Sequence, residues 1–139
     1  MSTTTIQVSL KAGERIYLNG AVIRVNRKVT IELLNDVVFL LEAHVLQADQ
    51  TTTPLRQLYF ILQAVLMDPR NAPATLALFH DVYSSTLASF SNESVRSGLK
   101  AAGALVADDR VFEALRTIRS LFPIEDEILS TPEESDQAA

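Results

Sequence analysis

Apolar and polar residues alternate along the first third of the chain, which is the pattern of half-buried β-strands. The alternation is present in residues 6–10 and is clearest between residues 15 and 34. Residues 37–41 form a short apolar run rich in β-branched and aromatic side chains. The pattern therefore predicts five short strands within about forty residues.

Two turns set the register of these strands. Asn19-Gly20 accepts positive φ at both central positions, so it predicts a tight hairpin between Leu18 and Ala21. Residues 26–28 predict a second, three-residue turn. Pairing outward from both turns gives one apolar face: Ile16, Leu18, Ala21, Ile23, Val25, Val29, Ile31 and Leu33. The other face is mixed: Arg15, Tyr17, Val22, Arg24, Thr30, Glu32 and Leu34. The apolar face needs a cover, either helices or a second copy of the chain.

The pattern changes to helical spacing after residue 50. Thr53 is a candidate N-cap and Pro54 suits the first helical position, so a helix is predicted from here to about Met67. Asp68-Pro69 ends it, because the residue before a proline is pushed out of helical geometry. The second half of this helix is apolar almost all round, which predicts a central, buried element.

Three further helices are predicted from apolar residues spaced three and four apart. They cover residues 73–90, 93–107 and 109–121, with Asn92 and Asp108 as N-caps for the second and third. Small residues in the middle helix would allow a neighbour to approach closely: Gly98, Ala101, Ala102 and Gly103. The short loops predict antiparallel packing.

The domain organisation follows from these segments. We expect an α+β protein with a β-sheet region at 1–50, a helical region at 51–122 and an acidic, disordered tail at 123–139. The tail carries six acidic residues and no Lys or Arg. Residues 1–122 hold all 12 basic residues against 11 acidic ones, so the body is close to neutral despite the net charge of −5.

Composition limits the function. The chain has no cysteine, no signal-peptide pattern and no apolar stretch near the ~20 residues that span a bilayer, so we expect a cytoplasmic protein that does not enter the membrane. His44 and His80 are isolated, and no metal site or other cofactor is expected. Asp108-Asp109 fits helix capping, and Ser84-Ser85 lies within a predicted helix. An enzyme is not expected.

Basic residues of the sheet region are the remaining candidates for function. Arg15 and Arg24 fall on one predicted face with Tyr17 between them, an arrangement that can contact phosphate and stack on an unpaired base. The candidate RNA-binding residues are Lys11, Arg15, Arg24, Arg27 and Lys28. The alternative is an ordinary solvated face balanced by Glu14, Glu32 and Glu42, and the residues alone favour it.

Three sequence blocks resemble the FlbT family of flagellin-synthesis regulators: residues 9–22, 52–60 and 66–69. The matching motif residues are Gly13, Glu14, Asn19, Gly20, Thr53, Pro54, Arg56, Tyr59, Phe60 and Pro69. The resemblance implies a post-transcriptional regulator that binds the 5′ untranslated region of flagellin mRNA and acts alongside the flagellar regulator FlaF. It leaves open whether the chain represses or activates flagellin synthesis.

A weaker resemblance links the five-strand pattern to the carbon storage regulators, RNA-binding proteins in which two chains interleave their strands. It implies an intertwined homodimer. One position departs from the FlbT pattern, which often has an arginine before the glutamate that ends the fifth strand. Leu41 precedes Glu42 here. A second hypothesis is therefore a protein-binding adaptor or chaperone for flagellin or FlaF, with its groove in helices 73–121.

Overall fold

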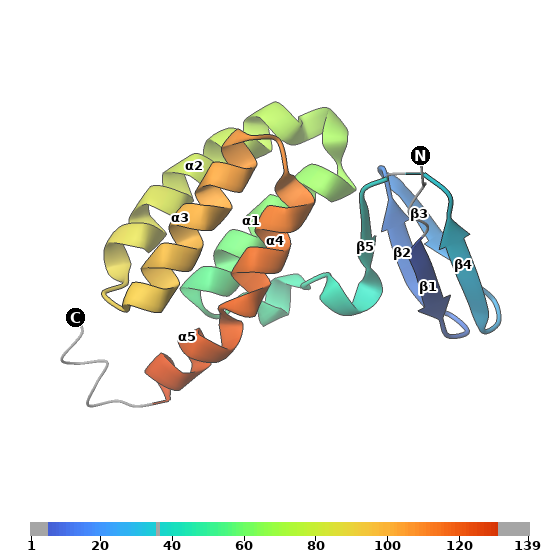
Figure 1. The fold of residues 1–139 in the computed structure, drawn as a ribbon, viewed down its shortest axis with the longest axis horizontal. Helices are drawn as coiled ribbons and strands as arrows, with labels where there is room; N and C mark the ends of the chain where they lie inside the picture. Colours follow the sequence, from blue (N-terminus) through green and yellow to red (C-terminus); the bar gives the residue numbers. More distant parts are fainter. Residues whose placement is uncertain (1–5, 36, 131–139) are drawn as a thin grey trace, which may run out of the picture.

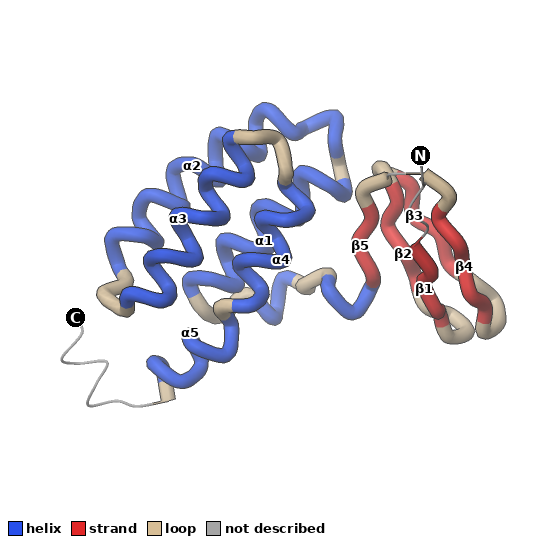
Figure 2. The backbone as a smooth tube through the Cα atoms, in the orientation of Figure 1, coloured by secondary structure: helices blue, strands red, loops and turns tan. Residues whose placement is uncertain are grey.

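Strands and helices occupy opposite ends of the molecule (Figures 1 and 2). The computed structural model describes residues 6–35 and 37–130. The strands are β1 (Ile6–Leu10), β2 (Arg15–Leu18), β3 (Ala21–Arg24), β4 (Val29–Leu33) and β5 (Phe39–Leu41). The α-helices are α1 (Pro54–Met67), α2 (Ala72–Ser89), α3 (Glu93–Ala107), α4 (Val111–Ser120) and α5 (Phe122–Leu129). Short 3-10 helices are η1 (Glu42–His44), η2 (Ala48–Gln50) and η3 (Pro69–Asn71). The predicted α+β class is confirmed.

The five strands form two small antiparallel sheets, β1-β4 and β3-β2-β5. The predicted tight hairpin joins β2 to β3, with Leu18 opposite Ala21. Asn19 and Gly20 have φ values of 51° and 88°, the positive values that the dipeptide was expected to supply.

The second predicted hairpin is wrong. Strand β4 pairs with β1 rather than with β3, so that Leu10 lies opposite Val29. Val25 instead extends the β2-β3 pairing: its carbonyl accepts from Gly13 N at 2.7 Å, and its N–H donates to the Glu14 carbonyl at 3.1 Å. The chain therefore crosses from one sheet to the other between Val25 and Val29.

This crossing covers much of the apolar face from within the chain. Ile16 is fully buried and forms a core with residues of the β1-β4 sheet, namely Val8, Leu10 and Leu33. Ile23, at the edge, remains 40% exposed. A second chain is therefore not required to bury the centre of the face. The interleaved homodimer stays a prediction.

The other face of β2 packs against the helices. Tyr17 is only 9% exposed and belongs to the main core together with Leu40 and Val45. The expectation that Tyr17 would lie on an open, polar face is wrong, because strand alternation that suits a solvated face also suits a face covered by another element. Strand β2 thus lies between the β1-β4 sheet on one face and the helices on the other.

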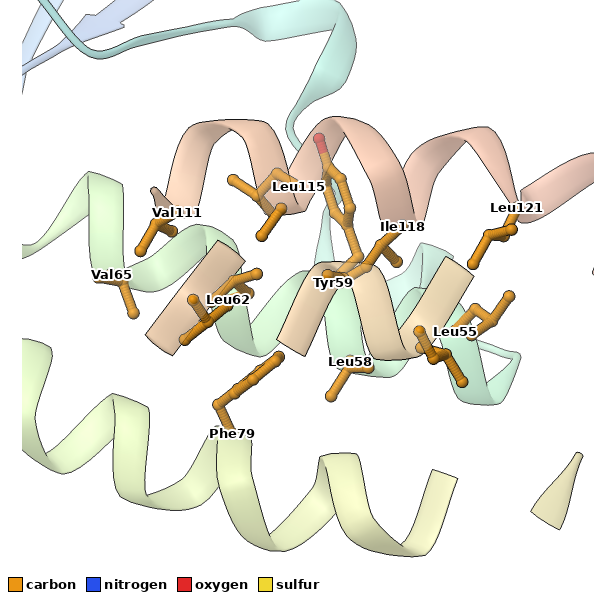
Figure 3. Close-up of a cluster of buried hydrophobic side chains, with 14 of the residues drawn as sticks. Leu55, Leu58, Tyr59, Leu62, Val65, Phe79, Val111, Leu115, Ile118 and Leu121 are labelled. Carbon is orange, nitrogen blue, oxygen red and sulfur yellow. The ribbon is translucent and has the colours of Figure 1, made fainter. Parts of the chain in front are cut away.

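Helix α1 lies at the centre of the main core, as its all-round apolar pattern predicted. Figure 3 shows its buried side chains between α2 and α4. Those side chains are Leu55, Leu58, Tyr59, Leu62 and Val65. Thr53 is the N-cap and accepts from Arg56 N at 3.3 Å, and Pro54 takes the first helical position, so both start signals are confirmed.

Small residues of α3 allow close packing, as expected. A Cβ added to Gly98 would lie 2.7 Å from Leu121, and one added to Gly103 would lie 2.5 Å from the Tyr83 hydroxyl. Asn92 caps α3 by accepting from Val95 N at 3.0 Å. Asp108 does not cap α4 as predicted; it closes the C-terminus of α3.

Helix α5 corrects the predicted disordered tail, whose first residues are folded. Glu125 is fully buried, accepting from Thr53 Oγ1 at 2.6 Å and from Leu55 N at 2.7 Å. Arg56 donates to Glu125 at 3.1 Å and to exposed Asp126 at 2.9 Å. The acidic residues thus satisfy the N-terminus of α1, where N–H groups and the helix dipole favour negative charge. Residues 131–139 lie outside the described part of the chain.

Burial raises the pKa of the Glu125 carboxyl above its ordinary value, while the hydrogen bonds from Thr53 and Leu55 and the charge of Arg56 act in the opposite direction. The carboxylate is therefore held by donors on three residues in a site that disfavours its charge. Among the described helices, none combines the length and apolar character needed to cross a membrane.

We expect Glu125→Gln to lower the free energy of unfolding by about 2–3 kcal/mol. The substitution keeps the side-chain shape but turns one acceptor into a donor that faces other donors. Asp126→Asn, on the exposed side of the same arginine, should cost less than about 1 kcal/mol. Urea denaturation of both variants measures the difference, and equal losses would contradict a special role for the buried carboxylate.

Candidate nucleic-acid interface

The five candidate cations gather at one end of the β part. The connections β1-β2 and β3-β4 lie at this end (Figure 1). Arg15 and Arg24 are direct partners across β2 and β3. Lys11 and Lys28 flank the paired residues that end β1 and begin β4. All five side chains, those of Lys11, Arg15, Arg24, Arg27 and Lys28, are exposed. We call this set the basic end of the sheet.

Nearby carboxylates bind the backbone of this end rather than its cations. Glu14 Oε1 accepts from Lys11 N at 2.7 Å, which closes the β1-β2 turn. Glu42 Oε1 accepts from Arg15 N at 2.7 Å, which attaches the end of β5 to the start of β2. These bonds fix the acidic side chains in place.

The basic end has no internal ion pair. Within residues 6–35 and 37–130, the ion pairs join Arg56 to Glu125 and Asp126, and Arg110 to Glu113. Direct opposition of Arg15 and Arg24 costs stability, since like charges face each other across a strand pair. The alternative of a solvated face balanced by glutamates therefore finds no ion pair to support it. Such a cluster is suited to an anionic ligand.

The basic end lacks the predicted aromatic platform. Tyr17 is buried, so it offers no face to a base. Leu41, at the position of the departure from the family pattern, lies opposite Ile16 and packs on the sheet core. The cations can therefore position phosphates. The tyrosine that was expected to stack on a base is not exposed.

Several motif residues act in the structure rather than at a surface. Gly20 approaches Pro69 so closely that an added Cβ would lie 3.3 Å from the Pro69 ring. Asn19 N donates to the Val38 carbonyl at 3.1 Å. The turn in the first motif block and the proline that ends α1 thus meet where the sheet contacts the bundle. Gly13 supplies a positive φ of 84° in the β1-β2 turn.

The second motif block joins the sheet to the bundle. The Tyr59 hydroxyl donates to the His44 carbonyl at 2.6 Å and accepts from Arg119 Nη1 at 3.0 Å. Thr53, Pro54 and Arg56 form the start of α1 already described. Phe60 points outward and is 36% exposed.

Two connecting residues were missed from sequence. Gln63, almost fully buried, accepts from Leu46 N at 2.9 Å and donates to the Leu46 carbonyl at 2.7 Å. Arg119 near the end of α4 contacts Tyr59. Gln63 is a lone glutamine within an apolar helix, and this could have indicated its role, since a buried amide needs hydrogen-bond partners. Nothing in the local pattern distinguished Arg119 from a surface arginine.

Metal ligands are not clustered in the described ranges, where no three His, Cys, Asp or Glu side chains are placed to hold an ion together. His44 lies beside Arg119. Partial burial and the charge of Arg119 lower its pKa, so the imidazole is neutral near pH 7.

Comparison with known proteins gives consistent matches. The model of the family described as "Flagellar protein FlbT" matches residues 6–129. A relative from Chelativorans sp. (strain BNC1) is 54% identical over 134 residues, 96% of this chain and 92% of its own. One from Agrobacterium fabrum is 51% identical over 130 residues, 94% of this chain and 87% of its own. Both are named "Probable flagellum biosynthesis repressor protein FlbT". No solved structure shows significant similarity to the chain.

Removing the Tyr59 hydroxyl should loosen the attachment of the sheet. We expect Tyr59→Phe to lower the free energy of unfolding by about 1–3 kcal/mol, because the partly buried His44 carbonyl and Arg119 each lose a partner. Tyr17→Phe is the matched control, since its hydroxyl joins no two elements by a hydrogen bond within residues 6–35 and 37–130. Chemical denaturation should show little change for the control, and an equal loss in both variants would argue against the bridge.

Proposed function

This chain belongs to the FlbT family of flagellar proteins, and we propose that it is a repressor of flagellum biosynthesis that binds the 5′ untranslated region of flagellin mRNA. Relatives at 51–54% identity carry the repressor name, which denotes a regulator rather than an enzyme. The observation that supports RNA as the ligand is the basic end of the sheet, whose five exposed cations have no ion pair among the described residues.

The proposed contact is mainly to phosphate. Exposed Arg and Lys side chains on two neighbouring turns can follow a flexible single strand, and phosphate contacts set position without reading sequence. Long-range steering is weak because the body of the chain is close to neutral. Binding therefore depends on local contacts. Preference for one leader over another must come from the shape of the RNA or from unpaired bases beside the basic end of the sheet.

A second candidate is a protein-binding adaptor or chaperone acting on flagellin or FlaF. An open hollow of about 380 Å³ favours it, but the hollow lies between the segment before β5 and helices α1 and α4 rather than within helices 73–121, where the groove was expected. Its apolar lining comes from the segment before β5 and from α1 and α4: Val37, Val38, Val65, Leu66, Val111 and Phe112. Co-purification with flagellin or FlaF tests this candidate, and failure with both proteins would count against it.

A homodimer remains part of the proposal. The free edge of β3 carries Val22 and Ile23, which are 61% and 40% exposed. An exposed apolar edge strand can pair with the same strand of a second copy. This edge lies beside Arg24, so pairing would bring two basic ends close to each other.

Charge reversal at the basic end tests the RNA proposal. We expect Arg24→Glu/Arg27→Glu to weaken binding to a flagellin leader by more than about tenfold and to reduce the dependence of the affinity on salt. The matched control is Arg70→Glu/Lys100→Glu, which makes the same charge change at exposed sites away from this end. Gel-shift titration at two salt concentrations measures both quantities.

A scrambled leader separates specific from general binding. If the wild-type chain binds both RNAs equally, or if salt leaves the affinity unchanged, recognition of the flagellin leader is wrong. Equal losses in the two double variants would instead mean that net charge alone governs the interaction.

Val22→Lys tests the proposed dimer. A lysine at a free strand edge opposes pairing with another strand, so we expect a shift from twice the mass of the chain to its single mass in light scattering. Leu78→Lys, at an apolar position on α2 that is 52% exposed, is the control. A wild-type chain that scatters as a monomer would contradict the homodimer.

A further inference from the structure

Arg119 is a partly buried cation without a carboxylate partner in the described chain. It lies in the last turn of α4, and its Nη1 donates to the Tyr59 hydroxyl at 3.0 Å. The ion pairs within residues 6–35 and 37–130 involve only Arg56 and Arg110 as cations. A neutral hydroxyl thus orients the guanidinium without neutralising its charge.

The remaining donors of Arg119 make no other hydrogen bond among the described residues. A guanidinium has five N–H donors, and only one is used in the bond to Tyr59. Among the described side chains, no buried nitrogen or oxygen lacks a hydrogen-bond partner. The other guanidinium nitrogens are therefore not fully buried. The dipole at the C-terminus of α4 favours a positive charge here, but this attraction leaves the remaining N–H groups of Arg119 unoccupied.

Arg119 is connected to the basic end of the sheet through a short series of contacts. The Tyr59 hydroxyl that holds Arg119 also donates to the His44 carbonyl at 2.6 Å. His44 ends η1, which begins at Glu42, and Glu42 accepts from Arg15 N at 2.7 Å. In Figure 1, η1 follows the lower end of β5, on the side of the molecule where the β1-β2 and β3-β4 connections lie.

The 3-10 helix η1 in this series carries one exposed small residue and one fixed acid. Ala43 is exposed in the middle of η1, and the Glu42 carboxylate is held by the Arg15 backbone. His44 adds no positive charge near pH 7, because partial burial and Arg119 lower its pKa. Arg119 is thus a cation of the helices that these contacts link to the basic end of the sheet.

We propose that Arg119 binds a backbone phosphate of the same RNA strand that occupies the basic end of the sheet. The bound strand then passes over η1, and Tyr59 is the positioning residue that aims the guanidinium. This inference rests on the proposed RNA binding and adds the helical bundle to the contact surface. An arginine fixed by a hydrogen bond loses less side-chain freedom on binding a phosphate than a free one does.

The test measures the affinity of each variant for the flagellin leader and the dependence of that affinity on salt. We expect Arg119→Gln, which removes the charge but keeps a polar side chain, to weaken binding about tenfold. The slope of log affinity against log salt should become shallower by about 0.7, the value for one phosphate contact in a single strand. Arg119→Lys should retain most of the slope, because it retains the charge.

A second substitution avoids the contacts within the bundle. Ala43→Glu places a negative charge on η1, the element that links Arg119 to the basic end, and we expect it to weaken binding by a similar factor. Ala104→Glu, at an exposed position on α3, is the matched control and should bind like the wild type. Thermal denaturation of each variant identifies any loss of folding, and Ala43→Glu keeps the test decisive if Arg119→Gln is unfolded.

The outcomes separate this inference from the proposed function. If folded Arg119→Gln and Ala43→Glu both bind with the wild-type affinity and slope while Arg24→Glu/Arg27→Glu loses binding, the extension onto α4 is wrong and the basic end stands. If the wild-type chain does not bind the leader, both proposals fail. Losses in Arg119→Gln and Ala43→Glu, with Ala104→Glu unchanged, support the longer surface.

Discussion

The position of the sheet on the helices depends on two polar side chains of α1. Tyr59 bonds the carbonyl of His44, and Gln63 bonds both backbone groups of Leu46. The segment between β5 and α1 has only the short 3-10 helices η1 and η2, so the peptide groups between them need partners from elsewhere once they are buried. An apolar α1 would leave these groups unpaired. The two side chains therefore convert a flexible connection into a fixed one, and every surface that spans the sheet and bundle relies on it.

Strand β2 transmits that constraint to the exposed end of the molecule. One of its faces contributes Ile16 to the core between the two sheets, and the other contributes Tyr17 to the core with the helices. A strand buried on both faces cannot shift by one residue without exchanging two well-packed side chains. Arg15 and its partner Arg24 are consequently held at a fixed place although their side chains are exposed. The interior of the β part thus determines the spacing of its surface charges.

Local sequence signals were sufficient where a few neighbouring residues decide the structure. Asn19-Gly20, Thr53-Pro54 and Asn92 each satisfy a backbone requirement within one turn, and each was predicted. Errors arose where distant residues compete. Val25 pairs with the β1-β2 turn instead of continuing a hairpin, and Glu125 gains three donors from α1 that no local pattern shows. The candidate cations were predicted from residue type and strand register. The burial of Tyr17, in contrast, results from packing against the helices, which the alternation of apolar and polar residues cannot reveal.

The contact between Gly20 and Pro69 has a consequence for the order of folding. Turn and proline are far apart in the sequence, so bringing them together closes a long loop and carries an entropy cost. The β2-β3 hairpin needs only two residues between its strands, and hairpins form within about 1–10 μs. Pairing of β1 with β4 closes a longer loop, which contains that hairpin. We therefore expect the cations Arg15 and Arg24 to come together early and the docking of the sheet onto α1 to be the slower, non-local step.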